Sequence, residues 1–177
     1  YPNDEQKVMF AKTFGCCRFV YNQLLALQKQ RYKDGESHLS KLKSNEFATR
    51  TLKKDYDFLK EIDKFAVSNA VFHLADAYDR FFKKQNHFPK FKSKRKSKKS
   101  YTTNFTNNNI LIGKNVIKLP KVGMVKAVIH KLPKDDWKLK SVTVSQDSVG
   151  NYFASVLFEY EQEDIPSVSK SSTNAIG

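Results

Sequence analysis

Hydrophobic residues in the first part of the chain recur at the period of an α-helix. One apolar stripe, with members three or four positions apart, consists of Phe10, Phe14, Cys17, Tyr21 and Leu24. Asn3, followed three positions later by Gln6, has the pattern of a capping box. Gly35 is a typical helix stop. The pattern therefore predicts one long helix from about residue 3 to residue 32.

Two more helices are predicted before the middle of the chain. The shorter covers residues 44–54, with Ser44 as its cap and with Phe47 and Leu52 facing the core. The longer covers residues 63–84. It carries a broad apolar face made of Ala66, Ala70, Leu74, Ala77, Tyr78, Phe81 and Phe82. We expect the three helices to form one bundle.

After Ser100 the hydrophobic period changes from helical to alternating. The predicted strands are 101–105, 110–112, 116–119, 122–129, 139–145 and 152–160. Turn-forming residues at 113–115 and 147–151 indicate two hairpins. Several short strands with such turns favour a small antiparallel β-barrel. The predicted fold class is therefore α+β, a helical bundle followed by a small antiparallel barrel.

These changes of pattern divide the chain into four parts. We predict a helical part over 1–86, a basic connector over 87–100 and a barrel over 101–163. The Ser-rich stretch 164–177 is interpreted as a linker, and its last residues are typical of the beginning of a new strand.

The charge of the chain indicates a polyanionic partner. Thirty-two Lys and Arg residues against 18 Asp and Glu give a formal net charge of +14. No apolar stretch reaches the roughly 18–20 residues that cross a bilayer. The only two cysteines, Cys16 and Cys17, are adjacent and cannot join distant segments, so we interpret them as small core residues. We expect a cytoplasmic protein without a membrane partner or a small-molecule substrate.

The charge is concentrated in one run. Residues 83–99 contain no acid and nine basic residues, which are Lys83, Lys84, Lys90, Lys92, Lys94, Arg95, Lys96, Lys98 and Lys99. Such clusters neutralise phosphates and release counterions, so we predict that they contact a nucleic-acid backbone. Phe88 and Phe91 lie within the run. They could stack on unpaired bases or pack onto the barrel, and packing is the preferred interpretation.

A second polar cluster follows at residues 105–109. Asn side chains can bond to adenine through two atoms, and a Thr methyl group can touch the methyl group of thymine. Asn is also common in turns because it tolerates left-handed backbone angles. From these residues alone the turn interpretation is the better one.

Short motifs in a fixed order connect these segments to a known family. They are Tyr-Pro-Asn at 1–3, Phe-Val-Tyr-Asn at 19–22, Asp-Lys-Phe-Ala at 63–66, Phe-Pro-Lys-Phe-Lys at 88–92, Phe-Thr-Asn-Asn-Asn at 105–109 and Lys-Leu-Pro-Lys at 118–121. Each motif alone is weak, but the six together extend over most of the chain. In this order they resemble the TnpB (OrfB) family of transposon-encoded RNA-guided DNA endonucleases, relatives of compact type V CRISPR nucleases.

The resemblance implies a fold, partners and a set of site residues. The helices would form a recognition lobe and the strands a wedge domain, with guide RNA and double-stranded target DNA as partners. The residues implied to read a short transposon-adjacent DNA motif are Lys64, Phe65, Ser68, Asn69, Phe105, Thr106 and Asn107. Some relatives have Gln where this chain has Ser68, which leaves the base preference at that position open. Asn69 could substitute for it or fill a polar gap in the bundle.

The same resemblance implies where the catalytic machinery lies. In the family a RuvC-like nuclease and a zinc-binding segment follow this part, and the first catalytic Asp is expected just beyond Gly177. We therefore expect no catalytic residue, metal ligand or cofactor here, whereas Mg²⁺ and Zn²⁺ are implied for the full-length relatives. Older descriptions of the family name the first helical stretch a helix-turn-helix domain. The length and apolar character of the first predicted helix favour the recognition-lobe interpretation.

Two other functions fit part of the pattern. A nuclease-dead relative acting as an RNA-guided transcriptional repressor would use the same helices and strands. A ribosomal or RNA-processing protein would account for the charge but not for the ordered motifs. The acidic residues expected after Gly177 distinguish the nuclease from the repressor.

Overall fold

One long helix begins the molecule, which we describe from a computed structural model over residues 1–160. Helix α1 covers Asp4–Lys33. Its predicted capping box is present, because the Gln6 amide donates to Asn3 Oδ1 at 2.9 Å and the Asn3 amide donates to Gln6 Oε1 at 3.0 Å. Beyond its end, Gly35 has a φ of +74°, a left-handed angle that favours glycine. The predicted beginning and end of this helix are confirmed.

A nearly continuous helical segment follows, and its predicted beginning was wrong. The cap is Ser40, whose hydroxyl accepts from the Lys43 amide at 3.3 Å. Ser44, the predicted cap, is instead buried on the inner face of the first turns, so tertiary packing and not capping explains it. The segment comprises α2 (Lys41–Glu46), the π-helical η1 (Phe47–Leu52) and α3 (Lys53–Asp55). A 3-10 turn that was not predicted, η2 (Asp57–Lys60), then places Leu59 in the core.

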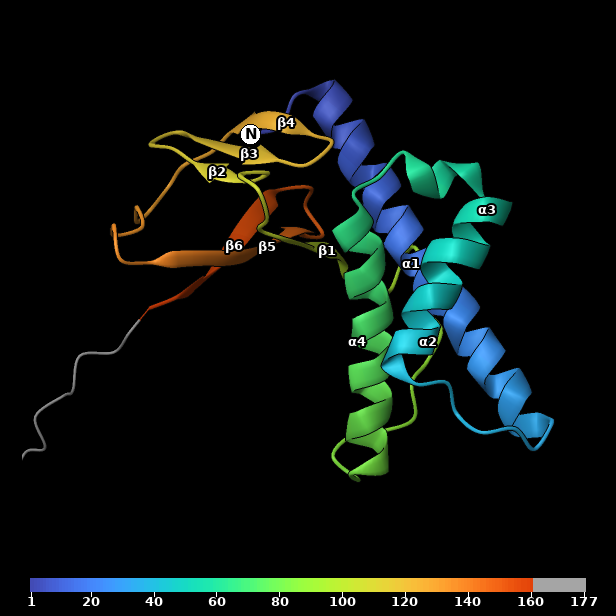
Figure 1. Cartoon of the computed structure of the whole chain (residues 1–177). Coiled ribbons are helices and arrows are strands. Elements are labelled where there is room, and N and C mark those ends of the chain that lie inside the picture. Colours follow the sequence, from blue (N-terminus) through green and yellow to red (C-terminus); the bar gives the residue numbers. More distant parts are fainter. Residues whose placement is uncertain (161–177) are drawn as a thin grey trace, which may run out of the picture.

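Helix α4 (Lys64–Phe82) lies beside α1 and completes the predicted bundle (Figure 1). Its buried residues are Ala66, Val67, Ala70, Val71, Leu74 and Tyr78. Phe82, which was predicted to belong to this apolar face, is instead 62% exposed. It lies at the last helical position, where the bundle no longer covers the helix.

The remainder of the described chain forms two antiparallel sheets of three strands. The first has the order β1-β5-β6 and the second the order β2-β3-β4. Their bounds are β1 (Lys99–Asn104), β2 (Leu111–Ile112), β3 (Val116–Leu119), β4 (Gly123–Lys126), β5 (Lys138–Gln146) and β6 (Tyr152–Glu159). The predicted turns join β2 to β3 and β5 to β6. The α+β class is confirmed, whereas the described residues form two separate sheets and do not confirm a closed barrel.

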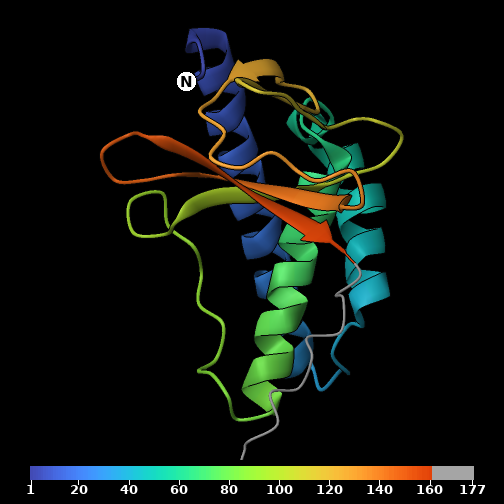
Figure 2. The same ribbon diagram turned by 90° about the vertical axis from the view of Figure 1, so that its left-hand side faces the viewer.

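The first sheet packs directly on the long helices. Ring centroids of Phe10 and Phe14 of α1 lie 6.3 and 5.9 Å from the ring of Tyr101 in β1. Tyr152 of β6 lies 5.3 Å from Phe10. The buried apolar residues of the helices and of the strands form one cluster. Figure 2 shows β1 and β5 crossing the long helices, an arrangement that holds the sheet in place on the bundle.

The second sheet is attached to the beginning of the chain. The Tyr1 ammonium donates to the Lys126 carbonyl at 2.5 Å, and Gln6 Nε2 donates to the Met124 carbonyl at 2.8 Å. Gln6 therefore caps α1 and docks it on β4 with the same side chain. The predicted part boundaries at 86, 100 and 163 stay predictions, and the predicted linker at 164–177 lies outside the described residues.

The two cysteines are core residues, as predicted. Cys16 and Cys17 are 6% and 8% exposed on α1. Burial raises the pKa of Cys16 to about 11 and that of Cys17 to about 12. Both thiols are therefore protonated at neutral pH and are poor nucleophiles.

Candidate nucleic-acid interface

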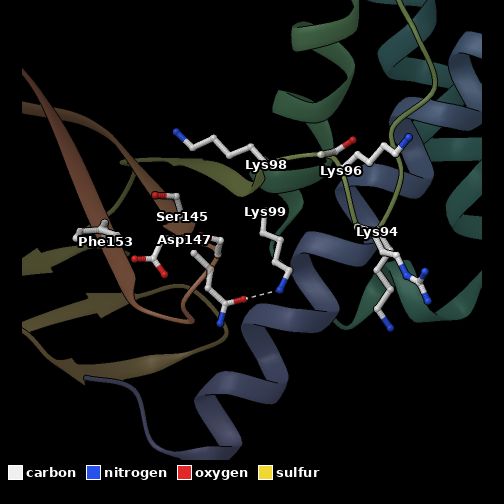
Figure 3. A pocket seen from close by; sticks show the side chains of 11 residues that line it. Lys94, Lys96, Lys98, Lys99, Ser145, Asp147 and Phe153 are labelled. Carbon is white, nitrogen blue, oxygen red and sulfur yellow. Dashed lines mark hydrogen bonds between the residues drawn. The ribbon is translucent and has the colours of Figure 1, made fainter.

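A wide groove of about 980 Å³ separates the basic connector from the β5–β6 hairpin. Figure 3 shows the labelled lysines of the connector on one side and Ser145, Asp147 and Phe153 of the hairpin on the other. The basic residues that line it are Lys94, Arg95, Lys96, Lys98 and Lys99. Within residues 1–160 none of these five side chains takes part in an ion pair. Their charges are thus available to an external polyanion.

The hairpin side of the groove supplies polar and aromatic groups. Lys99 Nζ donates to Gln146 Oε1 at 3.0 Å, which ties the connector to β5. The Asp147 carboxylate is occupied within its own turn, because it accepts from the amides of Val149 at 3.0 Å and Asn151 at 2.8 Å. Phe153 is 55% exposed at the groove. Basic side chains beside an exposed aromatic ring are the elements of a single-strand binding surface.

One predicted backbone contact, Lys92, faces the helices instead of the groove. Its ammonium lies 4.1 Å from the ring centroid of Tyr21, and burial lowers its pKa. The Asn22 side chain brackets the Lys92 backbone, donating to its carbonyl at 2.9 Å and accepting from its amide at 2.8 Å. Lys92 therefore anchors the connector on α1 and is badly placed for a phosphate.

The two aromatic residues of the connector also contact the helices. Phe88 packs edge-on against Tyr78 at 5.5 Å and Phe81 at 5.2 Å. Lys29 of α1 lies 5.5 Å from the Phe88 ring centroid and 4.7 Å from that of Phe91. The predicted packing on the barrel was therefore wrong, since these contacts are made with α1 and α4. Bundle contacts dominate because the connector leaves α4 and returns along α1 before β1 begins.

Hydrogen bonds join the beginning of α4 to β1. Asp63, the residue before α4, accepts from Thr103 Oγ1 through its carboxylate at 2.6 Å, and the two residues are 7% and 0% exposed. Six residues further on in α4, Asn69 Nδ2 donates to the Thr102 carbonyl at 3.0 Å and to Asn104 Oδ1 at 3.1 Å. These contacts make Asn69 a structural link between α4 and β1, whereas the alternative interpretation expected it to fill a polar gap within the helical bundle. Both hydrogens of its amide group are engaged.

Loss of the buried hydrogen bond between Thr103 and Asp63 should destabilise the contact between α4 and β1. We expect Thr103→Val to lower the free energy of unfolding by about 1–3 kcal/mol, because it leaves the buried Asp63 carboxylate without its donor. The neighbouring Thr102 hydroxyl pairs with Thr143 Oγ1 at 2.8 Å across β1 and β5 in a partly buried position. Thr102→Val is the matched control, with an expected loss below about 1 kcal/mol. Urea unfolding measures both, and equal losses would show that the Asp63 bond does not stabilise this contact.

The backbone of the turn after β1 is held by hydrogen bonds, and two of its asparagine side chains are exposed. Asn107 and Asn108 have φ angles of 45° and 56°, the left-handed values that Asn tolerates. Asn109 fixes the turn, accepting from the Thr106 amide at 2.8 Å and donating to the Asn104 carbonyl at 2.9 Å. The side chains of Asn107 and Asn108 are exposed. Backbone geometry thus explains asparagine here, and it leaves the Asn107 amide group free for a ligand.

The other predicted motif-reading residues are accessible at the same place. Lys64 is exposed with its ammonium 5.0 Å from the Phe65 ring centroid, and Ser68 is partly exposed. The amide of Phe105 donates to the Lys140 carbonyl at 2.8 Å, which places this residue against β5. Because Asn69 bonds to Asn104 and Asn104 bonds to Asn109, the beginning of α4 and the 106–109 turn form one connected unit. The structure therefore brings the two predicted halves close together.

Further lysines near Lys64 were not predicted. Burial lowers the pKa of Lys53, and the charge of Asp63 opposes this shift. The positive charges of Lys64 and Lys121 lower the pKa of Lys53 further, which places these three lysines near one another. Lys121 lies between β3 and β4 with a φ of +66°. No local signal could identify this group, because its members come from three separate segments. Phe153 was also missed, although the alternation in β6 places it on the face opposite Tyr152.

Exposed cations along a groove at one end of β1, together with a polar turn bonded to α4 through Asn104 at the other end, are features of a nucleic-acid-binding protein. None of the helices in the described part of the chain has the length and apolar character that a bilayer-crossing helix needs.

Residues 1–37 match the model of the IS605 OrfB helix-turn-helix domain. In the structure this matched segment is essentially the single helix α1.

Three relatives match larger parts of the chain. A Streptomyces pristinaespiralis protein named "Putative RNA-guided DNA endonuclease" is 29% identical over 179 residues, covering 100% of this chain and 43% of that protein. "Putative RNA-guided DNA endonuclease InsQ" of Escherichia coli strain K12 is 29% identical over 167 residues, covering 90% and 39%. "Virulence protein VsdF" of Salmonella dublin is 33% identical over 104 residues, covering 53% and 87%. The chain belongs to the TnpB (OrfB) family, and it spans about two fifths of the length of the first two relatives.

Proposed function

We propose that this chain is the part of an RNA-guided DNA endonuclease that holds the guide RNA and reads a short motif in double-stranded DNA. The observation that carries the proposal is the bonded unit of α4 and the 106–109 turn, which presents Lys64, Thr106 and Asn107 at the opposite end of β1 from a separate basic groove. Its relatives named as RNA-guided DNA endonucleases match this same region. Base pairing with a guide would supply the remaining specificity, as in other RNA-guided systems.

The two surfaces lie at opposite ends of β1. The groove includes Lys99, the first residue of the strand, and the turn follows Asn104, the last. Five residue steps of an extended strand correspond to roughly 17 Å. This separation allows an RNA backbone in the groove and a DNA duplex at the turn to be bound together.

Each surface suits a different kind of contact. The groove offers charge, which binds phosphates regardless of sequence and is weakened by salt. At the turn, an amide group and a hydroxyl group on a fixed backbone can form hydrogen bonds with base edges in the major groove of DNA. The groove therefore supplies affinity and the turn supplies discrimination.

Metal chemistry is assigned to no residue of this part. The full-length relatives would use Mg²⁺ and Zn²⁺, by the resemblance described above. Residues 1–160 contain no group of three or more His, Cys, Asp or Glu side chains that could hold a metal ion. The role proposed for residues 1–160 is binding and positioning of nucleic acid. The repressor alternative would use the same two surfaces and differ outside them.

The proposal predicts that RNA and DNA bind at the same time. The chain is saturated with a structured RNA hairpin and then offered a pool of duplexes with a randomised ten-base-pair stretch. We expect a sequence to be enriched from the pool, and the enriched duplex to form a ternary complex in a gel-shift assay. Displacement of the RNA by one equivalent of that duplex would place both ligands on one surface. A pool without any enrichment would contradict motif reading.

A further inference from the structure

A second cavity lies at the far end of the helical bundle from the motif-reading turn. Its volume is about 570 Å³, within the range of small-ligand sites. It opens between the last turns of α1 and α4 and the loop that follows α1. The lining residues with rings are Tyr32, His38, Tyr78, Phe81, Phe82 and Phe88. None of the predicted motif-reading residues lies in it.

Rings cover several sides of this cavity in different orientations. Tyr78 and Phe82 are stacked with centroids 6.1 Å apart, and His38 lies edge-on to Tyr78 at 4.4 Å. Several of these rings are exposed to solvent, and Tyr32 and Phe82 have exposed fractions of 84% and 62%. An exposed tyrosine and an exposed phenylalanine beside an apolar cavity provide flat surfaces on which another ring could stack.

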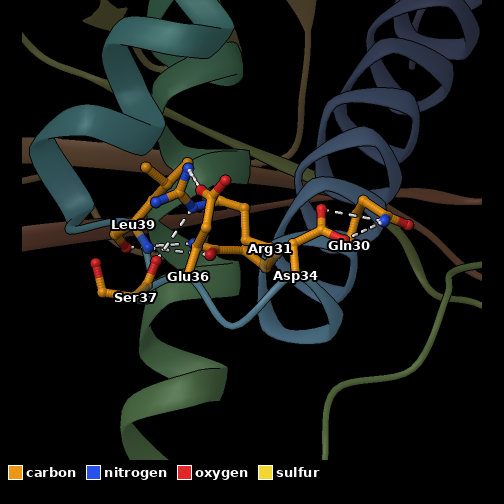
Figure 4. A network of polar contacts seen from close by, with 7 residues as sticks. Gln30, Arg31, Asp34, Glu36, Ser37 and Leu39 are labelled. Atoms are coloured by element: carbon orange, nitrogen blue, oxygen red, sulfur yellow. Dashed lines mark hydrogen bonds and ion pairs between the residues drawn. The ribbon is translucent and has the colours of Figure 1, made fainter.

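Polar contacts hold the loop wall of the cavity in place. Figure 4 shows the network around Arg31, whose Nε donates to the Ser37 carbonyl at 3.1 Å and whose guanidinium pairs with Glu36. The buried Gln28 side chain donates to the Leu39 carbonyl at 3.2 Å and accepts from the Leu39 amide at 3.0 Å. These contacts are all made within the chain and need no ligand, so a ligand would enter a preformed site.

The rim of the cavity is positively charged. Lys29 and Lys33 line it, and neither takes part in an ion pair among residues 1–160. Glu36, the acid in the lining, is already paired with Arg31. Lys83 and Lys84 follow Phe82 directly in the chain. Stacking surfaces beside phosphate-binding cations are the combination that single-stranded nucleic acids require.

We infer that this cavity binds one unpaired base of an RNA strand, stacked on Tyr32 and Phe82, with the adjoining phosphates at Lys29 and Lys33. The inference rests on the proposed function, because it assigns RNA as the strand that reaches this end of the bundle. Single-stranded RNA loops expose such bases, and aromatic stacking is their usual mode of recognition. The site would fix the position of the guide relative to the helices.

The test uses an RNA hairpin with a single 2-aminopurine in its loop, whose fluorescence falls when the base stacks on an aromatic ring. We expect wild-type chain to quench the signal. Phe82→Ala and Tyr32→Ala should each remove most of the quenching and weaken hairpin binding by about 5- to 100-fold. Both side chains are exposed, so the variants are expected to fold, which circular dichroism checks. Tyr160→Ala removes another exposed aromatic residue, one that stacks on Trp137 at 5.3 Å, and is the matched control.

The possible outcomes separate this inference from the proposed function. If the hairpin binds wild type and both cavity variants with the same affinity and the same quenching, no RNA base occupies the cavity and the inference is wrong. Equal quenching by the same hairpin in DNA form would overturn the assignment to RNA. If no hairpin binds, RNA binding itself fails. Nuclear magnetic resonance shifts caused by AMP then decide whether a base pocket exists, since shifts confined to the cavity support it and their absence overturns it.

Discussion

Replacement of Lys94, Arg95, Lys96 and Lys98 by serine is expected to weaken RNA binding on the order of 100-fold at 0.15 M salt. Each of these cations lines the groove and lacks an ion-pair partner within residues 1–160. Each phosphate contact to a single strand contributes about 0.7 to the slope of log K against log salt. Loss of four contacts should therefore reduce the slope by about 3. Fluorescence anisotropy titrations at several salt concentrations measure both quantities.

A control with the same loss of charge separates the groove from net charge. Lys114, Lys118, Lys126 and Lys134 are exposed and lie outside the groove lining. Their replacement by serine removes the same four charges. We expect only a small, general weakening from the reduced attraction between chain and polyanion. If both quadruple variants lose affinity and slope equally, the groove is one part of a diffuse basic surface and holds no strand.

Local signals in the sequence were sufficient for the elements whose ends depend on their own residues. Helix α1 begins at an Asn3–Gln6 capping box and ends before a left-handed Gly35, and both features are visible in the sequence. The turns predicted at 113–115 and 147–151 likewise join paired strands, and Gly150 in the second has a φ of 100°, a left-handed angle that favours glycine. Capping and turn formation involve neighbours in the chain, so they can be predicted from short patterns.

Elements that depend on distant contacts were predicted less well. Ser40 and Ser44 are both plausible caps, and only the packing of the helix, which buries Ser44, decides between them. The pairing of β1 with β5 joins residues about forty positions apart, Lys99 with Gln146 and Asn104 with Ser141, while β2–β4 form a sheet of their own. Hydrophobic alternation gives the faces of strands but not their partners, so a barrel and two sheets look alike in the sequence.

In the candidate site, too, features that depend on neighbouring residues were predicted, and features that depend on distant contacts were not. The acid-free run of residues 83–99 predicted a basic surface, because like charges cannot satisfy one another. It did not show that Lys92 packs on Tyr21 while Lys94–Lys99 face a groove. Asn69 was left with two interpretations, and its bonds to Thr102 and Asn104 support the structural one. Lys92 and the groove lysines carry the same chemical group, and only their surroundings in the folded chain distinguish their roles.

Strand β1 relates the two proposed binding surfaces to each other. It lies on α1 and α4, and Tyr101 and Thr103 of this strand are almost completely buried. One end carries the groove cation Lys99 and the other leads into the 106–109 turn. A buried strand has little freedom to move, so the distance between the two surfaces is fixed by the fold. A guide in the groove and a duplex at the turn would therefore keep a constant separation.

Loss of both Thr106 and Asn107 side chains should abolish the preference of the chain for its DNA motif. Each base-edge contact contributes about 1–3 kcal/mol of discrimination, which corresponds to roughly 5- to 150-fold. Thr106→Ala and Asn107→Ala should each flatten the enrichment obtained from a pool of randomised duplexes, and the double variant should enrich nothing. RNA-hairpin affinity should stay within about twofold, because the groove at the other end of β1 is untouched.

Asn108 provides the control for this experiment. Its φ of 56° is close to the 45° of Asn107, and both side chains are exposed. Alanine at either position incurs the same left-handed backbone strain, about 1 kcal/mol. Asn108→Ala should therefore destabilise the turn as much as Asn107→Ala while leaving the enriched motif unchanged. If the two single variants alter the motif equally, backbone strain accounts for the effect. If the double variant still enriches the wild-type motif, Thr106 and Asn107 are turn residues only, and the bases are read elsewhere on the molecule.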